Sequence, residues 1–133
     1  LNDGRVIQIG GFSGGSSDNR TELYDSKTDE WLEGPVMNNT RMLHTASLLD
    51  DGRVIAIGGT SRSGNMSHSE IYDPETQMWM ASGQMVEPRA SHTATVLDDG
   101  KVLVVGGTNT NNGICEIYDP ETGTWNSSIV ETE

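Results

Sequence analysis

The amino-acid sequence predicts an all-β fold built from three copies of one sheet-forming unit, and three observations support this prediction. The dipeptide Gly-Gly recurs at 10–11, 58–59 and 106–107, so the copies are 48 residues apart. Each Gly-Gly directly follows a short apolar run rich in β-branched residues, which is typical of a buried strand. No stretch of ten or more residues has the apolar spacing and capping residues of an α-helix. A regular period of this length indicates a repeat architecture.

Each copy is expected to form four strands, and the second copy shows the pattern most clearly. Its strands are predicted at 44–49, 53–57, 69–72 and 79–82. An Asp-Asp-Gly turn joins the first two strands, and an Asp-Pro-Glu-Thr turn joins the last two. A polar loop at 60–68 joins the middle pair.

The second strand of each copy is expected to be covered on both faces. In the third copy this strand, Val102-Leu-Val-Val105, is apolar at every position, whereas a strand exposed on one face would alternate. A four-stranded sheet that is covered on both faces and repeats along the chain is a propeller blade packed between its neighbours. The paired glycines fit a close approach of backbone segments, and Tyr and Trp are expected to fill the space between blades.

Charge and composition narrow the classes of partner. The 133 residues include 20 acidic and 8 basic side chains, which gives a net formal charge of −12. Nucleic acids and anionic membrane surfaces attract positive charge, so neither is expected as a partner. No apolar run approaches the roughly 20 residues of a membrane-spanning helix. The single cysteine, Cys115, excludes a disulfide within the chain and a cysteine-based zinc site.

The repeated motifs resemble the kelch repeat. That pattern combines four hydrophobic residues, a double glycine, and a Tyr and a Trp at a fixed separation; here it reads VIQIGG…YDSKTDEW, VIAIGG…YDPETQMW and VLVVGG…YDPETGTW. The resemblance covers essentially the whole chain and implies a kelch β-propeller segment of about three four-stranded antiparallel blades. Its structural positions are Gly10, Gly11, Tyr24, Trp31, Gly58, Gly59, Tyr72, Trp79, Gly106, Gly107, Tyr118 and Trp125.

The repeats are expected at about 1–40, 41–88 and 89–133, with the first strand of the first repeat missing. Propellers close with about four to eight blades, so three blades would leave open edges. We therefore expect the chain to be a segment of a larger closed propeller. The alternative is self-association of two copies into a six-bladed ring.

Three repeated glutamates, Glu22, Glu70 and Glu116, lie two residues before each tyrosine. Arg41 and Arg89 recur with the same period. A carboxylate that opens a partly buried strand should be paired. We expect these side chains to form charge-assisted hydrogen bonds within or between blades.

No motif of an enzyme active site is present: the sequence lacks a serine nucleophile elbow, an HExxH motif and a phosphate-binding loop. The resemblance extends to galactose-oxidase-like kelch enzymes, which use a cysteine–tyrosine crosslink and histidines around copper. Cys115 and Tyr118 offer such a pair, but Tyr118 is a repeat tyrosine. His44 and His92 are also equivalent to each other, which favours structural roles. We expect no catalytic residue, metal or cofactor in this segment.

A ligand is expected at the mouth of the central channel, where loops are held by rigid blades. The segments outside the repeat pattern, 12–20, 60–68 and 108–113, are the natural candidates. The resemblance adds Arg41 and Arg89, which match arginines that contact acidic peptides in some kelch proteins. The candidate ligand-binding residues are Arg20, Arg41, Arg62, Asn65, Arg89, Asn109 and Asn111.

Arginine and asparagine around a mouth suit a protein or an acidic peptide, and a carbohydrate is a second ligand class. The expected function is a non-catalytic protein-interaction module that presents variable loops. The alternatives are a non-catalytic part of a kelch enzyme, galactose-oxidase-like or other, and a cell-surface adhesive repeat protein.

Overall fold

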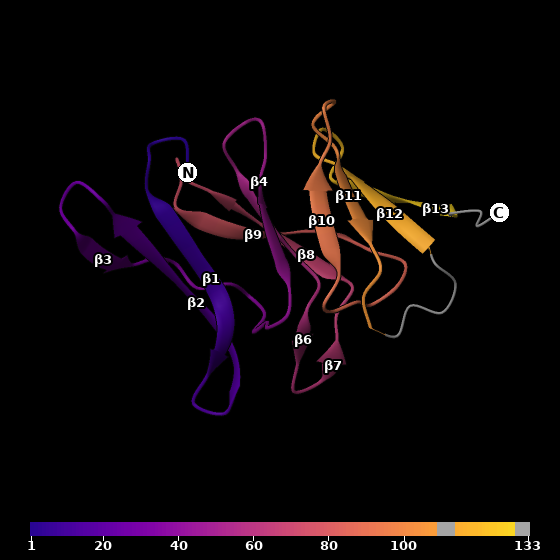
Figure 1. The fold of residues 1–133 in the computed structure, drawn as a ribbon, viewed down its shortest axis with the longest axis horizontal. Helices are drawn as coiled ribbons and strands as arrows, with labels where there is room; N and C mark the ends of the chain where they lie inside the picture. The colour runs from indigo at the N-terminus through magenta and orange to yellow at the C-terminus, as the bar shows by residue number, and fades with distance from the viewer. Residues whose placement is uncertain (109–113, 130–133) are drawn as a thin grey trace.

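The computed structural model describes residues 1–108 and 114–129. Within these ranges the regular structure is all strand, and no helix long and apolar enough to cross a membrane occurs. Three antiparallel sheets follow one another along the chain, from the indigo first sheet to the orange and yellow third (Figure 1). In each sheet the strands lie in chain order, so every connection within a sheet is a hairpin or a short loop.

The sheets contain three, four and four strands. The first sheet is β1 (Val6–Ser13), β2 (Ser16–Asp25) and β3 (Glu30–Glu33). The second is β4 (Thr45–Leu48), β5 (Val54–Ile57), β8 (His68–Asp73) and β9 (Met78–Gln84). The third is β10 (Thr93–Val96), β11 (Val102–Val105), β12 (Ile114–Asp119) and β13 (Thr124–Ile129). A separate hairpin, β6 (Thr60–Ser61) and β7 (Gly64–Asn65), lies between β5 and β8.

The repeat tyrosine and tryptophan are direct cross-strand partners in every sheet. Their ring centroids lie 5.1, 5.4 and 5.2 Å apart in the pairs Tyr24–Trp31, Tyr72–Trp79 and Tyr118–Trp125. Such tilted aromatic pairs add to the stability of a sheet beyond the area that they bury. The fixed spacing between tyrosine and tryptophan in the sequence therefore places the two rings opposite each other across one β-hairpin.

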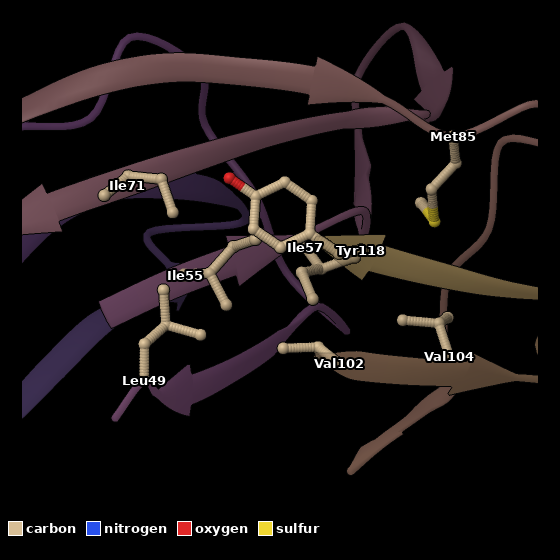
Figure 2. Close-up of a cluster of buried hydrophobic side chains, with 8 residues drawn as sticks. All are labelled: Leu49, Ile55, Ile57, Ile71, Met85, Val102, Val104 and Tyr118. Carbon is tan, nitrogen blue, oxygen red and sulfur yellow. The ribbon is translucent and has the colours of Figure 1, made fainter. Parts of the chain in front are cut away.

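The second and third sheets pack face to face around an apolar core, drawn in Figure 2. Ile55 and Ile57 of β5 are both 0% exposed. Val102 and Val104 of β11 and Tyr118 of β12 pack against them. β5 is buried at all four positions, which confirms that the second strand of this blade is covered on both faces.

The first and second sheets share a second core made by the repeat aromatics of the second sheet. Tyr72 and Trp79 are buried against Ile9 and Met37. Trp79 also donates its indole Nε1–H to Thr21 Oγ1 over 3.1 Å. Trp125 repeats this contact on the second sheet, donating to Ser69 Oγ and to the Gly83 carbonyl. Trp79 and Trp125 therefore each join their own sheet to the preceding sheet through an indole hydrogen bond.

The double glycines lie where connections between sheets pass close to the strand ends. A Cβ built on Gly58 would lie 2.5 Å from the carbonyl oxygen of Arg89, and one on Gly59 would lie 2.7 Å from that of Met42. Both residues also have positive φ. Gly58 thus makes room for the connection that leaves the second sheet, and Gly59 for the connection that enters it. The expected close backbone approach is confirmed.

Two segments expected as loops contain strands instead. β1 continues to Ser13 and β2 resumes at Ser16, so much of 12–20 is paired. Gly14 and Gly15, with φ of 60° and 85°, supply a two-residue turn whose twist suits a hairpin. The segment 60–65 likewise forms the β6–β7 hairpin. The sequence shows only the polarity of these segments, and a paired hairpin exposed on both faces is polar too.

Candidate binding surface

The sheets have two ends that differ in structure. The loop end carries the tips of the β1–β2 and β6–β7 hairpins, the double glycines, and the connections 34–44 and 85–92 between sheets. The hairpin tips of this end point downward in Figure 1. The turn end carries the Asp-Gly turns and the turns between each tyrosine and tryptophan.

A buried ion pair fixes the first connection at the loop end. Arg41 donates from Nη2 to Glu70 Oε2 over 2.8 Å, and from Nη1 to the carbonyl oxygens of Gly58 and His68. The side chains of Arg41 and Glu70 are 0% and 1% exposed. The Glu70 carboxylate also accepts the backbone N–H groups of Asn38 (2.7 Å) and Asn39 (3.2 Å). One carboxylate therefore holds three donors of the same connection.

The second connection repeats this arrangement. Arg89 donates from Nη2 to Glu116 Oε2 over 2.8 Å and from Nη1 to the Gly106 carbonyl over 2.9 Å. The Glu116 carboxylate also accepts backbone N–H groups from Val86 and Glu87. The expected charge-assisted hydrogen bonds are thus confirmed for two of the three repeated glutamates.

These positions contradict the prediction that Arg41 and Arg89 contact a ligand. Both side chains are 0% exposed, and both terminal nitrogens of each guanidinium already donate to carbonyl or carboxylate oxygens. A buried charge must be paired inside the fold, so the repeated arginines hold the connections between the sheets in place. That part of the prediction is wrong.

The other predicted residues that the structure describes lie at or near the loop end. Arg20 is exposed and forms an ion pair with Asp18 over 2.6 Å. Arg62 is exposed at the β6–β7 turn, where no ion pair is formed to it among the described residues. Asn65 donates from Nδ2 to Thr108 Oγ1 over 3.1 Å, so it links the β6–β7 hairpin to the third sheet's loop. Asn109 and Asn111 lie outside the described residues.

The loop end also exposes apolar side chains that the sequence did not single out. They lie at the β1–β2 tip and on both connections, and they are Phe12 (66% exposed), Val36 (58%), Leu43 (58%) and Val86 (69%). Leu43 has a φ of 56°, which is costly for a leucine. Phe12 is the single phenylalanine of the chain and falls outside the repeat pattern. These two features are the sequence signal that points to an exposed, non-structural role for Phe12.

The two repeat histidines, His44 and His92, directly precede β4 and β10 at the loop end. His92 Nε2 lies 3.0 Å from Thr45 Oγ1, so it connects the second and third sheets. Burial lowers the pKa of His92 to about 4, with Arg89 adding to the effect. Burial and Arg41 likewise lower the pKa of His44 to about 4. Both imidazoles are therefore neutral at neutral pH, as suits packed structural side chains.

The residues that a copper site of the oxidase type would need do not converge. Cys115 and Tyr118 are three residues apart on β12, so their side chains point to opposite faces of the third sheet. Tyr118 bonds to Ser82 Oγ over 2.7 Å in the core with the second sheet. Across the described ranges, no group of three or more His, Cys, Asp or Glu side chains is arranged to hold a metal ion.

Comparison with known proteins agrees with this architecture. The family model of the kelch motif matches residues 2–38 and 88–127. Among solved structures, the chain is similar to a fungal alcohol oxidase of the AA5 family in complex with copper. The TM-score is 0.73 and the identity 24%, over 92% of this chain and 27% of that one. No curated protein matches the chain.

The likeness to the oxidase concerns the fold, because the identity is low and the chain spans about a quarter of that structure. The motif match covers more than half of this chain. The match falls on the first and third sheets, whose tyrosine–tryptophan pairs and double glycines recur in the second. The chain therefore belongs to the kelch repeat family, and its three sheets are blades of a kelch β-propeller.

Proposed function

We propose that this segment is a non-catalytic protein-interaction module whose loop end binds a peptide or protein partner. The observation that carries the proposal is the presence, at one end of the blades, of exposed apolar side chains and of Arg62, an exposed cation that forms no ion pair among the described residues. Exposed apolar and arginine side chains are what partner-binding surfaces typically offer. The repeats, at about 1–40, 41–88 and 89–133, are the scaffold.

The scaffold beneath this surface is held in one conformation by buried polar contacts. Besides the two arginine–glutamate pairs, Met42 and Thr60 exchange backbone hydrogen bonds of 3.0 and 2.8 Å. Gly59 N–H donates to the Arg89 carbonyl over 2.9 Å, which ties the second sheet to the following connection. A surface ordered in advance loses less entropy when it binds.

The chemistry of the surface favours a peptide that carries carboxylate and apolar side chains. Arg62 offers a guanidinium without a competing ion pair among the described residues, while Arg20 is already matched by Asp18. Phe12 and Leu43 offer apolar area. Asn65 and, outside the described residues, Asn109 and Asn111 are the proposed amide contributors. A carbohydrate is the second ligand class that amides and arginine would suit.

The experiment selects peptides on this chain from a random displayed library and measures their affinity for single variants. Arg62→Ala and Phe12→Ala should each weaken the selected peptides by about tenfold or more, as expected for contacts at the centre of an interface. Lys27→Ala is the matched control, because it removes an exposed cation at the turn end. Affinity lost in Lys27→Ala and kept in both loop-end variants would contradict the proposal.

A second candidate is that the segment is the scaffold part of a larger kelch enzyme. The similarity to an alcohol oxidase in complex with copper favours it. Catalytic residues would then come from outside this chain, because Cys115 and Tyr118 face opposite sides of their sheet. Oxidation of alcohols by a longer polypeptide that contains this chain, together with unchanged peptide binding in the loop-end variants, would favour this candidate.

A further inference from the structure

The six methionines of the chain fall into two groups. Met78 and Met80 lie on β9 and are 57% and 61% exposed. The other four lie at the loop end, in or beside the connections between sheets, and are buried or half-buried: Met37 (1% exposed), Met42, Met66 (8%) and Met85 (4%). The two groups therefore differ sharply in their access to solvent.

The buried methionines help to shape the loop end. Met37 and Met85 are equivalent in the repeat, and their Cε atoms lie 3.0 and 3.1 Å from where a Cβ on Gly10 and on Gly58 would be. Met85 also belongs to the apolar core drawn in Figure 2. An oxygen atom added to either sulfur would enter a packed apolar space, and burying an unpaired polar group is costly. Oxidation at these positions is expected to damage the fold.

Met78 and Met80 lie instead on the outermost strand of the second sheet. They are two residues apart, so their side chains leave the same face of β9. Trp79 between them points to the opposite face, where it is buried against the first sheet. Neither methionine belongs to an apolar core of the described residues. The strand thus presents two thioethers to solvent on one face.

The fold does not require an apolar side chain at either of these positions. Three of the four equivalent residues in the other two sheets are polar, the four being Glu30, Leu32, Thr124 and Asn126. A methionine sulfoxide is also polar. A sulfoxide at Met78 or Met80 should therefore be accommodated without loss of packing.

We propose that Met78 and Met80 form a reversible oxidation site that accepts oxygen atoms from a hydroperoxide. Its modification changes the outer edge of the second blade from apolar to polar while the blade stays folded. The site lies at the start of β9, next to the turn between Tyr72 and Trp79, and so near the turn end. It does not depend on the binding surface proposed at the loop end.

Each oxidation transfers one oxygen atom. A lone pair of the thioether sulfur attacks one oxygen of the hydroperoxide, and the O–O bond breaks as the S–O bond forms. The proton passes to the departing oxygen, which leaves as water or as an alcohol. The sulfur is oxidised by two electrons and the peroxide is reduced by them. Sulfoxide reductases reverse the change: two thiols become a disulfide and the oxygen leaves as water.

The first experiment treats the whole folded chain with dilute hydrogen peroxide and follows each methionine by peptide mass spectrometry with fragmentation. Met78 and Met80 should oxidise about tenfold or more faster than the buried methionines, because susceptibility follows exposure. In concentrated urea the rates should become similar. The proposal would be overturned by a rate at Met37, Met66 or Met85 that matches the β9 pair in the folded protein, or by a difference that persists in urea.

The second experiment measures whether the modification leaves the blade folded. Protein oxidised at Met78 and Met80 alone should unfold at the same urea concentration as untreated protein. The double variant Met78→Gln, Met80→Gln should do the same, because its amides imitate the polar sulfoxides. Met85→Gln is the matched control and should lower the folding equilibrium constant about tenfold or more, because it puts the same amide into the core. A measurable loss of stability in the protein oxidised on β9 would contradict the proposal.

Reversal is tested on the same oxidised protein. Methionine sulfoxide reductases for both sulfoxide epimers, supplied with dithiothreitol, should remove both added oxygens from the folded chain, because β9 is an edge strand. Sulfoxides on β9 that are reduced only after the chain is unfolded would show that the site is not reversible.

Discussion

Arg41 and Glu70 form a 2.8 Å ion pair whose side chains are 0% and 1% exposed, so solvent water reaches neither charged group. The pair joins the connection between two blades to the third strand of the following blade. Burying such charges is costly unless every partner is present, and here the carboxylate has three donors. The relationship implies a strong dependence of folding on either residue.

Glu70→Ala should destabilise the protein by about 3–5 kcal/mol, because it leaves the Arg41 guanidinium buried without its counter-charge. Asp51→Ala is the matched control. Asp51 bonds to Arg53 at an exposed Asp-Gly turn, with 50% of its side chain exposed, so its loss should cost less than about 1 kcal/mol. Urea unfolding monitored by tryptophan fluorescence gives both values. Equal and small effects would refute a structural role for the pair.

Tyr118→Phe and Tyr72→Phe should differ although the two tyrosines are equivalent. The Tyr118 hydroxyl shares a 2.7 Å hydrogen bond with Ser82 Oγ, so its removal should cost about 1 kcal/mol. The Tyr72 hydroxyl is buried without a partner among the described residues, because Gly34 stands at the position equivalent to Ser82. Tyr72→Phe should therefore be neutral or stabilising. Thermal unfolding of the two variants compares them directly.

Gly58→Ala should be far more damaging than Gly14→Ala. Both glycines have φ near 60°, so each alanine has the same left-handed backbone cost of about 1–2 kcal/mol. The alanine Cβ at 58 would also meet the Arg89 carbonyl oxygen at 2.5 Å, whereas at 14 no heavy atom of the described residues, apart from the chain neighbours, lies within 4 Å of the Cβ. A difference in unfolding free energy between the variants measures the close approach alone. If both lose the same stability, the connection can move aside.

Stability should fall as the pH drops from about 6.5 to about 4. Burial lowers the pKa of His92 to about 4 in the folded protein, below its ordinary value of 6.5. The unfolded chain thus binds more protons in this window. The contribution of His92 to the free energy of unfolding is therefore fully present above pH 6.5 and decreases as the pH falls below it. His92→Gln should lose less stability than the unsubstituted protein between these pH values. Parallel pH profiles from urea unfolding would contradict this assignment.

The blade architecture could be predicted from the sequence because each repeat position has a local physical reason. The spacing from Tyr24 to Trp31 is a hairpin register, and Gly58 is required by a backbone carbonyl 2.5 Å from where a Cβ would lie. Both signals occur in all three repeats, which makes the pattern recognisable in the sequence. The pairing of Glu70 with Arg41 was also predictable, because a carboxylate at a buried position needs a cation of the same period.

The binding surface was harder to predict because it depends on which arginine side chains stay exposed. Arg41 and Arg62 are both predicted as ligand-binding residues from the sequence, yet one side chain is fully buried and the other is exposed. Burial of Arg41 follows from the carbonyl of Gly58 and the carboxylate of Glu70, contacts that form only when the sheets are packed. Leu43 was overlooked because a single apolar residue in a connection carries no period.

The indole contact between neighbouring sheets has a consequence for cooperativity. Trp79 donates to Thr21 and Trp125 donates to Ser69, so the second and third blades are each bonded to the blade before them. In such a linear array the free energy of folding is a sum of blade terms and nearest-neighbour terms. Among the described residues, the three blades form two such boundaries, so the central blade is packed on both of its faces. Hydrogen exchange should therefore be slowest in β5 and β8 of the central blade, with opening that begins at the ends and moves inward.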